Sequence, residues 1–240
     1  DVHGYSCRFI KNIPNSIKYL EFMGRFNELV VIPSSVTHLK FGHFFNQPII
    51  IPDGVVHLTF SKEFNREINI PDSVTHLIFG EYFNRPIYIP KNVVHLEMGG
   101  FFNQKINIPE GMKYLKFGFV FNMPLTVPDS ITHLILGQNF NHPIDIPKNI
   151  EYLDLGRMFN QEIQLPDTLT HLTVGGVFKQ KIDIPEGIIY LHIHSNFLIK
   201  NTLPNNLRYL KIWGSSSHNR IKLPSKVTEL YVYDSFDKLV

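Results

Sequence analysis

The chain has 240 residues, of which 43% are hydrophobic and 18% are charged, a composition typical of an ordered globular protein. The 23 basic and 21 acidic residues leave a formal net charge of +2. Because no run of like charge occurs either, we expect no nucleic acid and no membrane surface as a partner. The single cysteine, Cys7, excludes an intrachain disulfide and fits a reducing compartment.

The first thirteen residues precede any regular pattern. They begin with Asp1 rather than methionine and lack the apolar core of a signal peptide. We therefore expect residues 1–13 to form an N-terminal cap or a link to an upstream region.

One proline then recurs at a fixed interval along the chain. From Pro14 to Pro204 it is found at every nineteenth residue, and Pro224 follows after twenty. A constant period of this length indicates a stacked repeat architecture. We expect eleven repeats of 19–20 residues over residues 14–223 and a C-terminal partial capping repeat over residues 224–240.

Each repeat carries two apolar segments, which are numbered here from its proline as position zero. Position +6 is always leucine and position +8 is apolar, a period-two alternation that predicts a strand with one buried face. An Ile-x-Ile pattern at +16 and +18 predicts a second, shorter strand, and nineteen residues leave no room for a useful helix. The predicted fold is an all-β-rich repeat solenoid with a parallel sheet on one face, a second short-strand sheet on the other and little or no α-helix. The leucines of the first strands are Leu20, Leu39, Leu58, Leu77, Leu96, Leu115, Leu134, Leu153, Leu172, Leu191, Leu210 and Leu230.

Positions +12 and +13 are phenylalanine and asparagine in most units. So long a row of exposed phenylalanines would form a very large apolar stripe, so we expect these rings to stack inside the coil. Asparagine side chains have donors and an acceptor, and can satisfy backbone groups where the coil leaves its strand. This predicted structural ladder comprises Phe45, Asn46, Phe64, Asn65, Phe83, Asn84, Phe102, Asn103, Phe121, Asn122, Phe140, Asn141, Phe159 and Asn160.

The combined motif resembles a known family. The Val-x-x-Leu-x-Phe pattern is similar to the leucine-rich repeat signature, and FGHFFN at residues 41–46 with Ile51-Pro52 resembles the FNIP repeat. That family is a leucine-rich-repeat variant found in social amoebae and giant DNA viruses and used for protein binding. Some members carry an F-box-like domain, so the resemblance implies a target-binding part of a ubiquitin ligase receptor. It also implies a viral or amoebal protein in the cytoplasm of an infected or amoebal host cell.

The outward positions of the predicted strand are the candidate binding surface. Position +5 is a uniform column of His and Tyr, whereas position +7 varies from repeat to repeat. A uniform column suits a structural role, with stacked and hydrogen-bonded rings, and a variable column suits recognition. The predicted partner-binding residues are His38, His57, His76, His95, Glu97, Tyr114, Lys116, His133, Tyr152, Asp154, His171, Tyr190 and His192.

Other kinds of site fit the sequence less well. A row of histidines, with His192 and His194 on one strand, offers metal ligands, but an open ladder does not converge on one ion. Neither a phosphate-cradling glycine loop nor a zinc-protease motif is found. We expect no metal, no cofactor and no enzymatic activity. The expected function is protein binding, and the alternative is an architectural role with self-association, for example as a homodimer.

Overall fold

The computed structural model describes residues 13–214 and 222–233. Most of the expected N-terminal cap, including Cys7, and residues 234–240 of the partial capping repeat lie outside the described residues. The described residues divide into two compact units. The first comprises residues 13–112 and 116–119, and the second comprises residues 113–115, 120–214 and 222–233.

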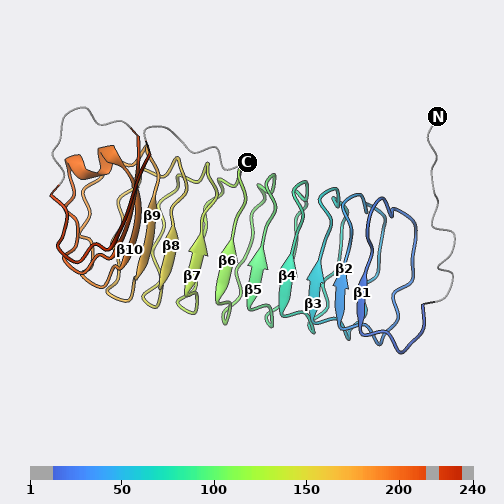
Figure 1. The fold of residues 1–240 in the computed structure, drawn as a ribbon. Coiled ribbons are helices and arrows are strands. Elements are labelled where there is room, and N and C mark those ends of the chain that lie inside the picture. The colour runs from blue at the N-terminus through green and yellow to red at the C-terminus, as the bar shows by residue number, and fades with distance from the viewer. Residues whose placement is uncertain (1–12, 215–221, 234–240) are drawn as a thin grey trace, which may run out of the picture. The chain divides into compact units, whose positions relative to one another are not determined.

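Each coil contributes one short strand, and the strands follow one another in chain order in a parallel arrangement (Figure 1). The predicted leucine-rich-repeat-like β-solenoid is therefore confirmed. The strands of the described residues are β1 (Tyr19–Glu21), β2 (His38–Lys40), β3 (His57–Thr59), β4 (His76–Ile78), β5 (His95–Glu97), β6 (Tyr114–Lys116), β7 (His133–Ile135), β8 (Tyr152–Asp154), β9 (His171–Val174), β10 (Tyr190–His194), β11 (Tyr209–Trp213) and β12 (Glu229–Tyr233).

The repeat length fixes the strand register. In the pair of β3 and β4, His57 lies opposite His76 and Leu58 opposite Leu77, so equal positions of successive repeats form continuous columns. The leucines of this column turn inward and are buried, while their neighbours at +5 and +7 remain partly exposed. Alternation with period two therefore places one face of each strand in the core and leaves the other open.

Glycine at +9 follows most strands, at a place where adjacent backbones approach closely. A Cβ atom added at Gly99 would collide with the carbonyl group of Gly80, and one at Gly118 would collide with that of Gly99. The last coils carry His194 and Trp213 at this position, and strands β10 and β11 continue through it to five residues.

The Ile-x-Ile segments do not form the second sheet that the sequence predicts. They are extended and bury residues such as Ile51 and Ile70, but the described residues contain no strand in them. The phenylalanine rings that precede these segments are farther apart than paired strands, at 6.2 Å for Phe64 and Phe83 against about 4.8 Å. Some segments also begin with a proline such as Pro86, which has no N–H to donate.

The phenylalanines at +12 form a continuous row in the core of each unit. The seven predicted ladder rings, from Phe45 to Phe159, have no exposed surface. Neighbouring rings are nearly parallel, with centroids 6.3 Å apart for Phe45 and Phe64 and 6.2 Å apart for Phe140 and Phe159. Phe79 at +8 also packs on Phe83, with centroids 4.0 Å apart. The core is thus two adjacent columns of aromatic and aliphatic side chains.

The asparagines at +13 join successive coils at the exit from this core. Each side-chain Oδ1 accepts the backbone N–H of the +13 residue in the next coil, as between Asn65 and Asn84 at 3.1 Å. At the end of the row Oδ1 of Asn160 accepts the backbone N–H of Lys179 at 2.7 Å. The accepting residue is thus an asparagine, while the residue that donates its backbone N–H can be of another type. The other described contacts of this kind start at Asn27, Asn46, Asn84, Asn122 and Asn141.

The prolines form the corner before each strand. The carbonyl of Pro71 accepts the N–H of Val74 at 3.1 Å, which closes a tight turn, and the same bond recurs after the other repeat prolines. Helical structure in the described residues is limited to one 3-10 helix, Ser195–Ile199. No helix among these residues has the length and hydropathy needed to cross a membrane.

Candidate functional site

The side chains at +5 and +7 of the strands form one surface in each unit, which we call the strand face. Every predicted partner-binding residue lies on this face and is at least partly exposed, as expected from the alternation. They are His38 in β2, His57 in β3, His76 in β4, His95 and Glu97 in β5, Tyr114 and Lys116 in β6, His133 in β7, Tyr152 and Asp154 in β8, His171 in β9, and Tyr190 and His192 in β10.

The +5 column is a stack of rings. In the first unit the imidazoles of His38 and His57 lie 4.4 Å apart and only 8° from parallel. In the second unit tyrosine and histidine alternate, and the rings of His171 and Tyr190 are 5.4 Å apart. The faces of these rings cover one another, so their edges and polar atoms are what a partner would contact.

Threonine at +4 orients several of these histidines. The Thr170 hydroxyl lies 3.0 Å from the carbonyl oxygen of Glu151 and 2.8 Å from Nδ1 of His171. It therefore links the imidazole to the backbone of the preceding coil, where the same carbonyl accepts the N–H groups of Thr170 and His171. Thr37 and His38 repeat the arrangement. The sequence pattern Thr-His therefore fixes the position of the imidazole.

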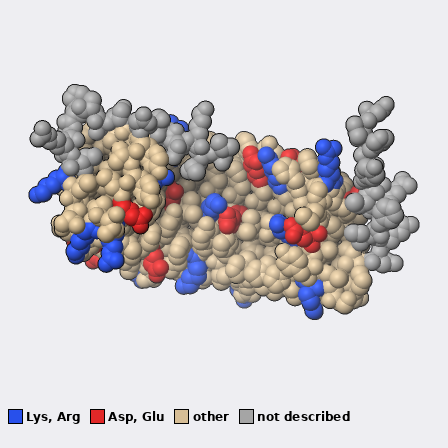
Figure 2. Space-filling view, in the orientation of Figure 1, with Lys and Arg blue, Asp and Glu red and all other residues tan. Residues whose placement is uncertain are grey.

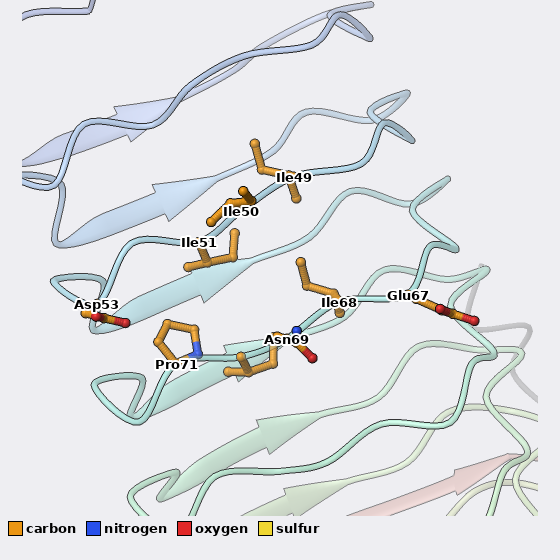
Figure 3. A pocket seen from close by; sticks show the side chains of 9 residues that line it. Ile49, Ile50, Ile51, Asp53, Glu67, Ile68, Asn69 and Pro71 are labelled. Carbon is orange, nitrogen blue, oxygen red and sulfur yellow. The ribbon is translucent and has the colours of Figure 1, made fainter.

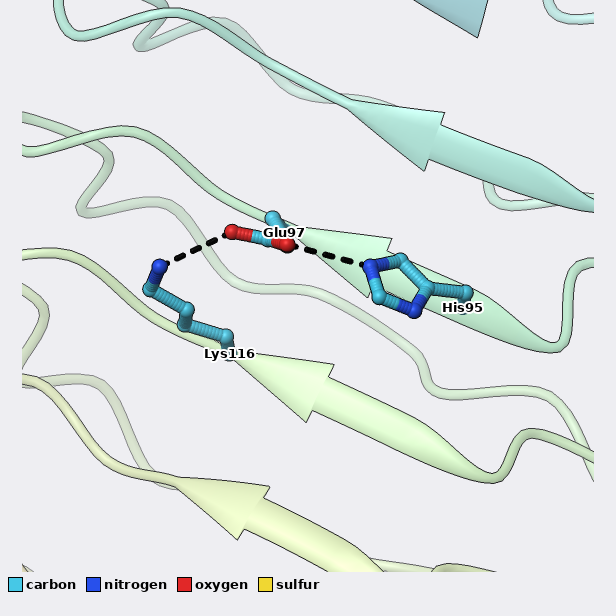
Figure 4. Close-up of polar contacts among 3 residues, drawn as sticks. All are labelled: His95, Glu97 and Lys116. Carbon is cyan, nitrogen blue, oxygen red and sulfur yellow. Dashed lines mark hydrogen bonds and ion pairs between the residues drawn. The ribbon is translucent and has the colours of Figure 1, made fainter. Parts of the chain in front are cut away.

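His95 follows Val94 instead of threonine and makes a different contact. Its Nε2 donates to Oε1 of Glu97 at 3.1 Å, while Nζ of Lys116 donates to Oε2 at 2.9 Å (Figure 4). Burial acts to raise the pKa of Glu97, but the hydrogen bonds from Lys116 and His95 and their charges together lower it below its usual value. The carboxylate is thus a charged group held from both sides, within its own strand and from the next.

Burial disfavours the charged form of four histidines on the strand face, His57, His76, His171 and His192. It lowers the pKa of His57, His76 and His171, and the neighbouring histidines lower these values further. The largest effect is at His192, whose pKa falls to about 4 through burial and the charge of Lys211. At these four positions the face therefore offers neutral hydrogen-bonding groups at neutral pH.

The acidic residues at +7 differ between the two units. In the first, Glu21 pairs with Lys40 at 2.7 Å, and Glu97 pairs with Lys116. In the second, Asp154 has its Oδ1 bonded to the N–H of Gly156 at 2.8 Å, and burial raises its pKa to about 6. No Lys, Arg or His among residues 13–214 and 222–233 forms an ion pair with Asp154.

Two further surface features were not anticipated from the sequence. Phe44, Tyr82 and Phe101 at +11 are 38–46% exposed, and the rings of Tyr82 and Phe101 stack at 5.3 Å. An open groove of about 370 Å³ lies between two Ile-x-Ile segments, residues 49–51 and 68–70, where Ile50 is 87% exposed (Figure 3). Aromatic residues recurring at +11 of these units could have indicated the first feature, but the groove depends on the missing second sheet.

The charged groups visible in Figure 2 are interspersed, with Lys and Arg beside Asp and Glu rather than gathered by sign. Such a mixed surface suits a protein partner better than a polyanion. Among the described residues, no three His, Cys, Asp or Glu side chains converge on a point where a metal ion could bind.

Comparisons with known proteins agree with this architecture. The family model described as FNIP Repeat matches residues 7–44, 45–70, 67–101, 102–139, 121–158, 140–176 and 159–196. A similar solved structure is CroV588, a giant-virus protein described as a novel circular leucine-rich-repeat protein. It is 33% identical, has a TM-score of 0.67, and the match covers 92% of this chain and 44% of that one. The chain thus spans less than half the length of CroV588. No curated protein sequence matches the chain.

Proposed function

This chain belongs to the FNIP repeat family, and we propose that it is a protein-interaction module that binds its partner through the strand face. The observation that carries the proposal is the contrast between the two columns of this face. The +5 rings form a regular, stacked base, whereas the +7 side chains change identity from coil to coil while occupying the same place in the register. A fixed framework that displays a varied row of side chains is the arrangement of repeat-protein binding surfaces.

The proposed mechanism is binding without chemistry by the chain itself. The strand backbone and the buried leucines hold the +7 groups in place, so little conformational entropy is lost when a partner binds. The imidazoles and phenols of the +5 column add hydrogen-bonding groups, and pairs such as Glu97 and Lys116 present both signs of charge. Complementarity to a mixed pattern of this kind favours specificity.

Exchanging the two members of an ion pair tests this proposal. In the double variant Glu97→Lys with Lys116→Glu, the pair can form again across the same strands, while its pattern of charge on the face is reversed. Both chains would be used as baits in cell lysate, and captured proteins would be identified by mass spectrometry. The matched control exchanges Asp129 and Lys148, a pair 2.9 Å apart on the turns after the prolines, well exposed and outside the strand face.

We expect the wild-type chain and the Asp129/Lys148 control to capture a partner protein. The Glu97/Lys116 variant should not capture it. Equal capture by all three baits, or loss with the control instead, would place binding on another surface. The groove beside Ile50 and the exposed rings of Tyr82 and Phe101 are the next surfaces to vary in that case.

A more specific form of this function follows from the family resemblance. The bound protein would be presented to a ubiquitin ligase in the cytoplasm of an infected or amoebal cell, and the chain would act there as a viral or amoebal adaptor. This form has only the resemblance in its support. Comparing the ubiquitination of the captured partner in cells with the wild-type chain and with the Glu97/Lys116 variant would test it.

A second candidate function is self-association, and strand β12 favours it. Leu230 and Val232 belong to columns that are buried in the interior coils, yet they are 45% and 67% exposed. Among the described residues β12 pairs only with β11, and an unpaired strand edge with apolar side chains is a site where another chain can add a strand. Light scattering tests this alternative, since a dimer that persists on dilution would support an architectural role and a monomer would oppose it.

A further inference from the structure

Asp154 is a carboxylate that has no countercharge among residues 13–214 and 222–233. On the strand face the +7 residue of one coil lies directly opposite the +7 residues of the two neighbouring coils. Asp154 in β8 therefore faces Ile135 of β7 on one side and Thr173 of β9 on the other. Glu97, by contrast, meets Lys116 of the next coil at 2.9 Å.

The basic group on the C-terminal side of the same column is also occupied elsewhere. Lys211 is three coils away from Asp154, beyond Thr173 and His192, and its Nζ lies 4.9 Å from the centre of the Tyr233 ring. Within the described residues Asp154 is left with one neutral donor, the N–H of Gly156 at 2.8 Å. A carboxylate accepts up to about four hydrogen bonds, so most of its capacity is open.

The side chains around Asp154 form a partly desolvated but reachable position. Asp154 lies among densely packed neighbours, yet it keeps some exposed surface, as do Tyr152 and Tyr190. Burial and the Asp154 charge raise the pKa of Tyr152. Burial and Tyr209 raise the pKa of Tyr190 to about 12, with a smaller contribution from the Asp154 charge. Both phenols are therefore neutral at physiological pH and close enough to sense the carboxylate.

We infer that this position is a docking site for a basic side chain, Lys or Arg, of a partner protein, centred on the Asp154 carboxylate; the inference rests on the proposed function of the strand face. The cation would take the place that Lys116 has beside Glu97. A guanidinium or ammonium group has only donors, which match the open carboxylate oxygen and the phenol oxygens. Because the site excludes much of the water, the charge pair is stronger than an exposed one.

The register offers a variant that fills the site from within. Thr173→Lys places a lysine one coil after Asp154, in the relation that Lys116 has to Glu97. It keeps the carboxylate and should close the site to an external cation, whereas Asp154→Asn removes the charge. The matched control is Thr59→Lys, in the same column of the first unit, where the neighbours are Lys40 and Ile78 and no carboxylate lies opposite.

The experiment selects binders to the wild-type chain from a display library of random linear peptides and measures their affinity by calorimetry. We expect selected peptides to share an Arg or Lys and to bind Asp154→Asn and Thr173→Lys about tenfold or more weakly. Thr59→Lys should bind as the wild type does. Replacing the shared Arg by citrulline, or Lys by acetyl-lysine, should weaken binding to the wild type and remove its difference from Asp154→Asn.

Selection that yields no peptide dependent on Asp154 overturns the inference. So does a carboxyl pKa of Asp154, measured by NMR in the free chain, at or below its ordinary value, since a cation of the chain itself would then already neutralise it. Neither result bears on the wider proposal, which the Glu97/Lys116 exchange decides separately. The exchange can abolish partner capture while the selected peptides bind the wild type and Asp154→Asn equally. This result would keep the strand face as the binding surface and reject the site at Asp154.

Discussion

The side-chain Oδ1 of Asn84 accepts the backbone N–H of Asn103 in the next coil at 3.0 Å. Asn84 in turn donates its own backbone N–H to Oδ1 of Asn65 at 3.1 Å. Asn84 therefore takes part in two such bonds, one to the coil before it and one to the coil after. The row adds side-chain bonds between coils to those that the backbone makes in the sheet and at positions such as Tyr82, whose N–H donates to the carbonyl of Lys62 at 2.9 Å.

Replacing Asn84 by alanine removes one of these acceptors. The N–H of Asn103 then loses its partner, and so does Nε2 of Gln104, which lies 3.1 Å from the same oxygen. We expect the free energy of unfolding to fall by about 1–3 kcal/mol, measured by urea denaturation. Asn107→Ala is the control, because Asn107 is exposed and no hydrogen bond of its side chain occurs among the described residues. Equal stability of both variants would show that water replaces the bond at no cost.

Phe102→Ala tests the aromatic row. Phe102 has no exposed surface, so its truncation removes buried contacts and leaves a cavity between two adjacent rings of the row. We expect a loss of about 3–5 kcal/mol in the free energy of unfolding. The neighbouring Phe101 is 46% exposed and provides a matched control, for which Phe101→Ala should cost far less. Similar losses in a thermal or urea melt would contradict the assignment of +12 as the core position.

The repeat period explains how much of this fold can be predicted from the sequence. A column such as Leu58 and Leu77 identifies the strand, its buried face and its register at once, because equal positions must stack. The Ile-x-Ile segments have the same alternation but form no strand pairs among the described residues, so alternation alone does not predict a sheet there. The strand face follows from alternation, whereas the isolation of Asp154 becomes evident only when Ile135 and Thr173 are seen opposite it.

His192 should make the second unit sensitive to acid. Its folded-state pKa of about 4 lies below the value of about 6.5 that an unfolded histidine has. The unfolded state therefore binds more protons below pH 6.5, and the stability present above that pH is lost as the pH falls towards 4. We expect His192→Gln to reduce this loss by on the order of 2 kcal/mol, measured by urea unfolding between pH 7.5 and 4.5. Parallel pH profiles of the two chains would contradict the assignment.

Asp154 should act in the opposite direction, because its folded-state pKa of about 6 lies above the ordinary value of 3.8. Its stabilising contribution is full below pH 3.8 and is lost as the pH rises through 6, so the ionised carboxylate destabilises the fold at neutral pH. We expect Asp154→Asn to be more stable than the wild type at pH 7.5, by up to about 3 kcal/mol. The difference should shrink as the pH falls through 6 towards 4. The phenols of Tyr152 and Tyr190 stay neutral throughout this range.

Thr173→Lys provides a second variant for the measurement of stability against pH. It keeps the Asp154 charge and neutralises it with a lysine, whereas Asp154→Asn removes the charge. A lysine beside Asp154 should stabilise the ionised carboxylate, and so raise the free energy of unfolding at pH 7.5 while lowering the carboxyl pKa. Thr59→Lys meets no carboxylate and lies opposite Lys40, so it should not raise the free energy of unfolding and should leave the carboxyl pKa of Asp154 unchanged. One outcome is that both Asp154→Asn and Thr173→Lys stabilise the chain and weaken the binding of basic peptides. In that case the ionised carboxylate lowers the stability of the fold and serves binding. If Asp154→Asn is instead less stable at pH 7.5, the carboxylate already has a partner within the chain.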